Sequence, residues 1–173
     1  NRTGCAACTI KISSIDERIS KQREQVKSVK FDDNSCLIVT YLETDPLYYI
    51  DLTDKLNPQI IAGYEEPGYN TYLHYLDNNL ALGFGYNIGY KMGLYTLEDG
   101  IPNKVDEINY DYIRVVANHK ALYIEGNVFG FGGYLYSDEY IDEYGYYTTG
   151  IKYVYDVYTI EAYEDTFKFK LLK

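Results

Sequence analysis

Strand-like hydrophobic runs, each closed by a short polar turn, recur at regular intervals along this chain. One run ends at Phe31 before Asp-Asp-Asn, a second at Leu76 before Asp-Asn-Asn, and a third at Ala117 before Asn-His-Lys. These anchors are about 45 and about 41 residues apart. Leu52 and Leu97 close two later runs, LYYIDL and MGLYTL, again about 45 residues apart. A repeat of this length, with about four strands per unit, is typical of stacked four-stranded sheets.

The alternation of residues within each repeat predicts where the strands lie. The run CLIVTYL in the first repeat is apolar on both faces, as expected of a strand covered on both sides. Asp45 and Pro46 are predicted to form a structural turn between the second and third strands, because Asp-Pro bends the chain. Strands are expected near 26–31, 36–42, 47–51 and 59–64 in the first repeat, near 72–76, 80–86, 90–96 and 103–108 in the second, and near 112–117 and 120–125 in the third.

The third repeat is longer than the first two. The stretch from Ala117 to its counterpart Ile160 exceeds the matching stretches by about 22 residues. This surplus is expected to form a long hairpin insertion over 127–150, joined by an acidic tip at 138–143. A last alternating run at 166–171 is expected to be the closing strand.

These patterns predict a single all-β domain, a β-propeller-like array of about three four-stranded antiparallel blades forming a partial propeller. The blades are expected at 26–64, 72–109 and 112–172, with the hairpin insertion 127–150 in the third. Residues 1–25 differ from the repeats and are expected to form a strand and a short helix.

The charge of the chain excludes some partners. The 173 residues carry a formal net charge of −10, with a pI of about 4.6. Binding to nucleic acid needs clustered Lys and Arg, and docking on an anionic membrane needs a basic surface, so neither is expected. No apolar run approaches 18 residues, and no membrane span is expected.

Three cysteines bear on metal binding and on location. Cys5 and Cys8 have the spacing of half a zinc site, but no second Cys or His pair follows them. If the protein is exported, a disulfide from Cys36 to Cys5 or to Cys8 is expected, which leaves one thiol unpaired. Neither a metal nor another cofactor is therefore predicted.

Histidine and acidic residues are the candidates for catalysis or metal binding. His74 and His119 lie in or beside the first turn of a repeat, where a His is expected to hold the turn through a hydrogen bond. Acidic pairs are frequent in the predicted turns, and paired carboxylates are the catalytic groups of glycosidases. The tip residues Asp138, Glu139 and Asp142 are a weak candidate site for Ca²⁺, because they lack the spacing of a calcium loop.

The most distinctive composition is the tyrosine content, 23 residues with no Trp. Solvent-facing tyrosines give rigid contact area at a low entropy cost. One hypothesis is that the tyrosines of the long hairpin bind a partner, and the alternative is that every second tyrosine packs on a neighbouring blade. Nine tyrosines lie in or just after the predicted long hairpin, and three of them are Tyr153, Tyr155 and Tyr158. The predicted binding residues are Tyr134, Tyr136, Tyr140, Tyr144, Tyr146 and Tyr147.

Several motifs resemble a family of secreted bacterial and archaeal proteins that carry a C-terminal β-propeller domain distantly similar to WD40 propellers. The resemblance covers roughly 25–172. It implies a propeller fold and an extracellular or cell-envelope location, and it implies no activity. Propellers of that family have more blades than this chain. The motifs are Gln25–Phe31, Thr44–Tyr48, Ile50–Leu52, Pro67–His74, Gly83–Tyr86 and Asn118–Ala121.

Three functions remain open at this point. The first is a non-catalytic module that binds protein or glycan, or assembles with copies of itself through the hairpin and open sheet edges. The second is a polysaccharide hydrolase that uses paired carboxylates. The third is a purely structural part of a larger propeller.

Overall fold

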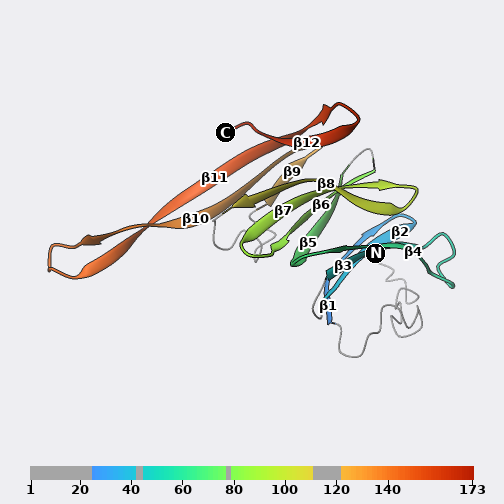
Figure 1. Cartoon of the computed structure of the whole chain (residues 1–173), viewed down its shortest axis with the longest axis horizontal. Helices are drawn as coiled ribbons and strands as arrows, with labels where there is room; N and C mark the ends of the chain where they lie inside the picture. The colour runs from blue at the N-terminus through green and yellow to red at the C-terminus, as the bar shows by residue number, and fades with distance from the viewer. Residues whose placement is uncertain (1–24, 42–44, 77–78, 111–121) are drawn as a thin grey trace, which may run out of the picture.

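Within residues 25–41, 45–76, 79–110 and 122–173, which the computed structural model describes, the chain forms twelve β-strands and no helix (Figure 1). The strands make three four-stranded antiparallel sheets, so the prediction of consecutive four-stranded units is confirmed. Sheet 1 contains β1 (Gln25–Asp32), β2 (Ser35–Tyr41), β3 (Asp45–Asp51) and β4 (Gln59–Glu66). Sheet 2 contains β5 (Tyr69–Leu76), β6 (Leu80–Tyr86), β7 (Tyr90–Glu98) and β8 (Ile101–Tyr110). Sheet 3 contains β9 (Leu122–Glu125), β10 (Val128–Ile141), β11 (Tyr147–Tyr163) and β12 (Thr166–Leu171).

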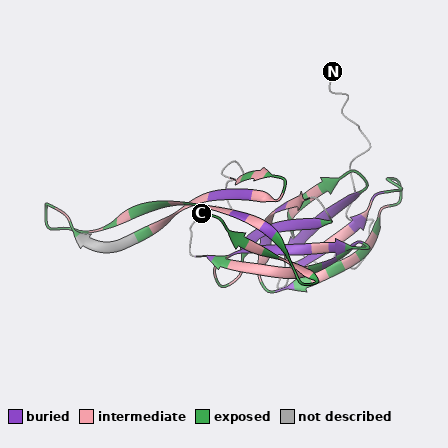
Figure 2. Ribbon diagram, turned by 90° about the horizontal axis from the view of Figure 1, so that it is seen from above, coloured by how far each residue is buried: buried purple, intermediate pink, exposed green. Residues whose placement is uncertain are grey.

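The sheets stack through apolar side chains that alternate along the central strands. Leu37 of β2 and Leu47 of β3 pack with Tyr95 of β7 in the core between sheets 1 and 2. Phe84 of β6 meets Phe131 of β10 edge to face, with 5.6 Å between ring centroids, in the core between sheets 2 and 3. Figure 2 shows that the buried residues are concentrated in these stacked sheets. The apolar pattern on both faces of the central strands therefore has a direct cause in stacking.

One hydrogen bond recurs in every sheet and fixes how the repeats correspond. In each sheet, a backbone N–H of the third strand, or of the residue directly after it, donates to the carbonyl of the asparagine in the first turn. The three bonds are Leu52 to Asn34 (2.7 Å), Leu97 to Asn79 (2.8 Å) and Ile160 to Asn127 (3.2 Å). The pairing of Leu52 and Leu97 with Ile160 across the repeats is therefore confirmed.

The same bond corrects the start of the third repeat. The turn that matches the first two is Gly126–Asn127, between β9 and β10, and not the turn predicted after Ala117. Ala117 and the strand predicted at 112–117 lie outside the described residues. Asn118-His119-Lys120 is as polar as the turn at Asn127, so local composition did not separate the two.

The correspondence defines two equivalent faces in each sheet. We call the face that packs on the following sheet the forward face, and the opposite one the backward face. The forward faces contain Leu37, Val39 and Leu47 in sheet 1 and Leu82, Phe84 and Met92 in sheet 2. The backward faces contain Cys36, Ile38 and Ile50 in sheet 1 and Phe129, Phe131 and Tyr158 in sheet 3.

The two central strands of sheet 3 extend far beyond their neighbours. The edge strand β9 pairs only with Val128–Phe131 of β10, and β12 pairs only with Tyr158–Tyr163 of β11. Beyond these positions β10 and β11 pair only with each other. We call this two-stranded ribbon, residues 132–156, the arm. Figure 1 shows it projecting away from the stacked sheets.

The turn of the arm differs from the predicted acidic tip. It lies at 142–146, where Gly145 adopts a positive φ of 83°. Asp142 Oδ1 accepts hydrogen bonds from the backbone N–H groups of Tyr144 and Tyr146, both at 2.9 Å. Glu139 instead belongs to β10 and is paired with Thr149. A carboxylate that bonds nearby backbone amides favours a turn, and this bonding places the turn after Ile141.

Candidate functional site

The tyrosines of the arm form an exposed aromatic surface on one face. Tyr134 and Tyr153 are directly opposite each other across the two strands, with ring centroids 6.5 Å apart. Tyr136 lies two residues along the same strand, with its ring centroid 5.8 Å from that of Tyr134. Tyr136 is 58% exposed and Tyr153 is 80% exposed. Alternation along β11 puts Tyr155 on this same face, which we call the tyrosine face.

The tyrosine face continues the forward face of sheet 3. By the repeated hydrogen bond, Gly130 and Gly132 occupy the positions of Leu82 and Phe84 in sheet 2. The ring of Tyr155 lies over the gap, since a Cβ on Gly130 would be 2.7 Å from the Tyr155 hydroxyl oxygen. Tyr155 is nevertheless 53% exposed. The side chains that are buried by the following sheet in sheets 1 and 2 are thus replaced here by a glycine groove and exposed tyrosine.

The other predicted binding tyrosines lie at the end of the arm, except Tyr140, whose side chain lies outside the described part of the structure. Tyr144, Tyr146 and Tyr147 are all more than two-thirds exposed. Tyr158 is different, because it is buried and stacks on Phe129 in the core. The hairpin therefore contains both solvent-exposed tyrosines and a tyrosine packed in the core, each in a different part.

Asp142 has a structural role in the arm. We expect Asp142→Ala to weaken the arm turn by about 1 kcal/mol, because two backbone amides lose their acceptor. Hydrogen exchange at Tyr144 and Tyr146 should accelerate about fivefold. Glu143→Ala, which changes an exposed carboxylate of the same turn, is the control. Unchanged exchange in Asp142→Ala would contradict the assignment.

The candidate calcium ligands do not form a cation site within the described residues. No group of three or more His, Cys, Asp or Glu residues there could hold a metal ion. Asp142 is used by the turn, and the side chains of Asp138 and Glu139 are not described. Among the described side chains of the arm, Asp142 therefore acts in the turn and not as part of a metal site.

The residues predicted to hold turns have other contacts where they are described. His74 lies inside β5, opposite Leu82, and its Nδ1 is 3.2 Å from the Tyr72 hydroxyl. Burial, together with Lys30, lowers the His74 pKa. Asp45 and Pro46 are the first residues of β3, opposite Glu66 and Glu65, and Pro is tolerated at such a position. His119 lies outside the described residues.

Cys36, the cysteine proposed for a disulfide, is fully buried on the backward face of sheet 1. It has no disulfide partner among the described residues, which include neither Cys5 nor Cys8. Burial raises the pKa of its thiol to about 11. Cys36 is therefore a core residue with little thiolate at neutral pH.

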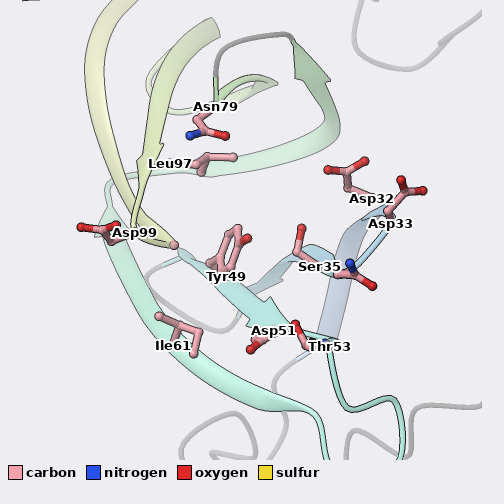
Figure 3. Close-up of a pocket in the computed structure, with 12 residues that line it drawn as sticks. Asp32, Asp33, Ser35, Tyr49, Asp51, Thr53, Ile61, Asn79, Leu97 and Asp99 are labelled. Carbon is pink, nitrogen blue, oxygen red and sulfur yellow. Dashed lines mark hydrogen bonds between the residues drawn. The ribbon is translucent and has the colours of Figure 1, made fainter.

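An acidic cavity of about 570 Å³ lies where the turns of sheets 1 and 2 meet (Figure 3). Asp32 and Asp33 lie side by side on one wall, and Asp99 lies across from them beyond the Tyr49 ring. Asp51 accepts hydrogen bonds from the Thr53 hydroxyl and backbone N–H, which lower its pKa. Asp32 and Asp33 are one of the acidic pairs in the predicted turns, whereas Asp99 was not among those pairs. Turns at the same end of neighbouring repeats lie close together when the sheets stack. Applied to the sequence, this rule could have placed Asp99 near Asp32 and Asp33.

A buried ionic network, which the sequence analysis missed, joins sheet 1 to sheet 2. Glu66 ends β4, and its side chain is 1% exposed. Lys91 Nζ, completely buried on β7, lies 3.0 Å from Glu66 Oε1, and Lys104 Nζ of β8 lies 2.9 Å from Glu66 Oε2. The Tyr95 hydroxyl donates to Glu66 Oε1 at 2.5 Å, and Asn70 Nδ2 donates to the same oxygen at 3.0 Å.

The pKa values in this network follow from its contacts. Burial alone would raise the Glu66 pKa, but bonds from Tyr95, Lys91 and Lys104 outweigh burial and lower it. Burial and the Glu66 charge raise the Tyr95 pKa well above 10. Partial burial would lower the Lys104 pKa, yet bonds to Glu107 and Glu66 raise it to about 12. All charges are compensated within the network, so its role is to hold the two sheets together.

Stacking of consecutive four-stranded antiparallel sheets through one repeated face relation is the arrangement of propeller blades. Residues 10–165 match the model of the β-propeller domain family. The chain belongs to this family. Its three described sheets are blades of a partial propeller, with the arm extending from the third blade.

Two proteins similar to this propeller chain come from archaea. An uncharacterized protein of Archaeoglobus fulgidus is 32% identical over 124 residues, covering 66% of this chain and 20% of that protein. An uncharacterized protein of Methanocaldococcus jannaschii is 40% identical over 87 residues, covering 49% of this chain and 14% of that protein. The chain thus corresponds to a fifth or less of the length of these relatives.

Two further findings concern the propeller chain. No solved structure matches it. The described part of the chain contains no helix with the length and hydropathy of a membrane span.

Proposed function

We propose that this propeller chain is a non-catalytic binding module of the cell surface or extracellular space, and that it binds protein or glycan through the tyrosine face of the arm. The observation that carries the proposal is the exposure of Tyr136, Tyr153 and Tyr155 along one side of a projecting ribbon. Tyrosine offers a broad apolar ring and a polar hydroxyl, which suits contact with a partner surface or the face of a sugar ring.

Three further properties support a binding role. The arm projects from the blades, so both its faces can be reached from solvent (Figure 1). Its exposed tyrosines form a row on one face, and extended exposed apolar surface is typical of interaction sites. Tyr95, whose pKa is raised well above 10, is completely buried in the blade 1–blade 2 network, so its hydroxyl does not face solvent.

The cavity between blades 1 and 2 carries the second candidate function, a hydrolase of polysaccharide. Asp32, Asp33 and Asp99 line it together with the Tyr49 ring, and an aromatic wall beside carboxylates suits a sugar (Figure 3). The carboxylate of Asp51 is engaged by Thr53. This alternative is separated from the binding role by an assay for product.

Two probes test the binding role: soluble polysaccharides (hydroxyethyl cellulose and mannan) in affinity electrophoresis, and the chain itself in light scattering. Retardation or self-association is expected for the native chain. The double variant Tyr136→Ser and Tyr153→Ser should weaken either interaction at least about tenfold. The control is Tyr86→Ser, which changes a tyrosine on β6 that is 41% exposed and lies outside the arm.

The proposal would be overturned if the double variant matched the native chain with both probes. Release of reducing ends from the same polysaccharides, abolished by Asp32→Asn with Asp99→Asn, would establish the hydrolase instead.

A further inference from the structure

The forward face of blade 3 lacks the cover that the equivalent faces of blades 1 and 2 have. Leu37, Leu47, Leu82 and Met92 are completely buried, because the following blade packs on them. The equivalent residues in blade 3 are two glycines and the half-exposed Tyr155. The surface thus keeps the position of a docking face but has the flatter, aromatic chemistry of an interface between molecules.

The side chains on the backward face of blade 1 are buried. Cys36, Ile38 and Ile50 on that face are at most 1% exposed, and Leu52 is 7% exposed. This face therefore offers none of these apolar side chains to the blade 3 of a second copy, which disfavours head-to-tail stacking. The self-contact that uses the exposed forward face is contact with the same face of another copy, which requires a two-fold axis.

The arm is expected to become more stable when a partner surface packs on it. A two-stranded ribbon alone is marginally stable in water, because it buries little surface for the entropy it loses. Along 132–141 of β10 and 147–156 of β11, the described strands pair only with each other, so both outer edges are open. Tyr136, Tyr153 and Tyr155 add an aromatic surface that can contact an identical surface.

The charges along blade 3 complement each other when two arms run antiparallel. Asp142 and Glu143 lie at the turn, about eight residues beyond Tyr134. Lys168 of β12 lies at the base of the arm, where it is paired with Glu161 of β11. Glu161 is about eight residues from Tyr153, in the direction away from the turn. A two-fold axis at the Tyr134–Tyr153 pair therefore brings the acidic turn of each arm to the basic strand of the other.

We infer that two copies of this chain pair arm against arm, antiparallel, through the tyrosine face. This inference rests on the proposed binding role and names a second copy as the partner. The tyrosines of one arm pack on those of the other around the axis. The acidic turn of each arm contacts the β12 strand of the other copy, which contains Lys168. This contact of opposite charges sets the register of one arm against the other.

The test is the mass of the intact chain by light scattering over a dilution series, from about 1 μM to about 500 μM. A dimer that dissociates on dilution is expected. Tyr136→Ser with Tyr153→Ser should raise its dissociation constant at least about tenfold, and Tyr86→Ser should leave it unchanged.

A charge swap tests the register. Glu143→Lys alone and Lys168→Glu alone should each weaken the dimer, and the two together should restore it, because each acidic turn then again faces an opposite charge. A dimer indifferent to all these changes would overturn the arm pairing.

Light scattering and the polysaccharide assay together distinguish a failure of the dimer from a failure of the proposed binding role. A monomer at every concentration that polysaccharide still retards would overturn the dimer and keep the binding role. A monomer that no polysaccharide retards would overturn both.

Discussion

Replacement of Glu66 by Ala is expected to lower the free energy of unfolding by about 3–5 kcal/mol. The Glu66 carboxylate is the acceptor for Lys91, Lys104 and Tyr95, all in blade 2, while Glu66 itself ends the last strand of blade 1. Without it, Lys91 remains a fully buried ammonium whose other bond is to the Pro67 carbonyl. The cost is large because an uncompensated charge stays in the interior.

Urea unfolding at pH 7 measures this effect. The control is Glu161→Ala, which removes an ion pair with Lys170 of 2.6 Å between two half-exposed side chains. Such exposed pairs contribute less than about 1 kcal/mol. A loss in Glu66→Ala no greater than in Glu161→Ala would contradict the assigned role of the network.

The same carboxylate gives stability a dependence on acid pH. The Glu66 pKa is lower in the folded chain than its ordinary value of 4.5. A group with a lowered folded pKa contributes stability that is present above the unfolded pKa and lost as the pH falls through the folded pKa. We expect the urea concentration at the unfolding midpoint to decrease as the pH is lowered below about 4.5. The decrease should be less steep in Glu66→Gln, because Gln has no charge to lose.

Replacement of Phe131 by Ala is the second change with a large expected effect, about 3–5 kcal/mol of unfolding free energy. The ring is 1% exposed, and its centroid lies 5.6 Å from Phe84, 5.4 Å from Tyr110 and 5.6 Å from Tyr158. Ala would leave a cavity at the center of the blade 2–blade 3 core, where rigid sheets on both sides limit collapse.

Phe31→Ala, on an exposed part of β1, is the matched control, because its ring is 53% exposed. It should cost less than about 1 kcal/mol. Urea unfolding followed by tyrosine fluorescence measures both variants, since the chain has no Trp. Equal midpoints for Phe131→Ala and Phe31→Ala would mean that blade 3 does not depend on this contact.

The two predictions bear on function through the arm. Phe131 belongs to the part of β10 that packs on blade 2, and Gly132, the next residue, begins the arm. The arm is thus a continuation of the strand that anchors blade 3. Loosening the Phe131 core should weaken both stability and any interaction of the tyrosine face, whereas Tyr153→Ser should affect the interaction alone.

The candidate site was predictable in part. Tyrosine content and the surplus length of the third repeat indicated the hairpin, because both are local properties of the sequence. The division into buried Tyr158 and exposed Tyr153 and Tyr155 was not predictable from composition. Tyr158 lies on the backward face, which blade 2 covers, whereas Tyr153 and Tyr155 lie on the forward face, and only the stacking of the blades decides which face is covered.

The fold shows the same division. The sequence by itself determined the repeat period, the strand type and the first turn of each of the first two blades, since alternation and turn-forming residues act between near neighbors in the chain. The tertiary structure decided that the first turn of the third repeat lies at Asn127, that Glu66 meets Lys91 and Lys104, and that Asp99 faces Asp32 and Asp33. Those contacts join residues far apart in sequence, and they exist only because the blades stack in register.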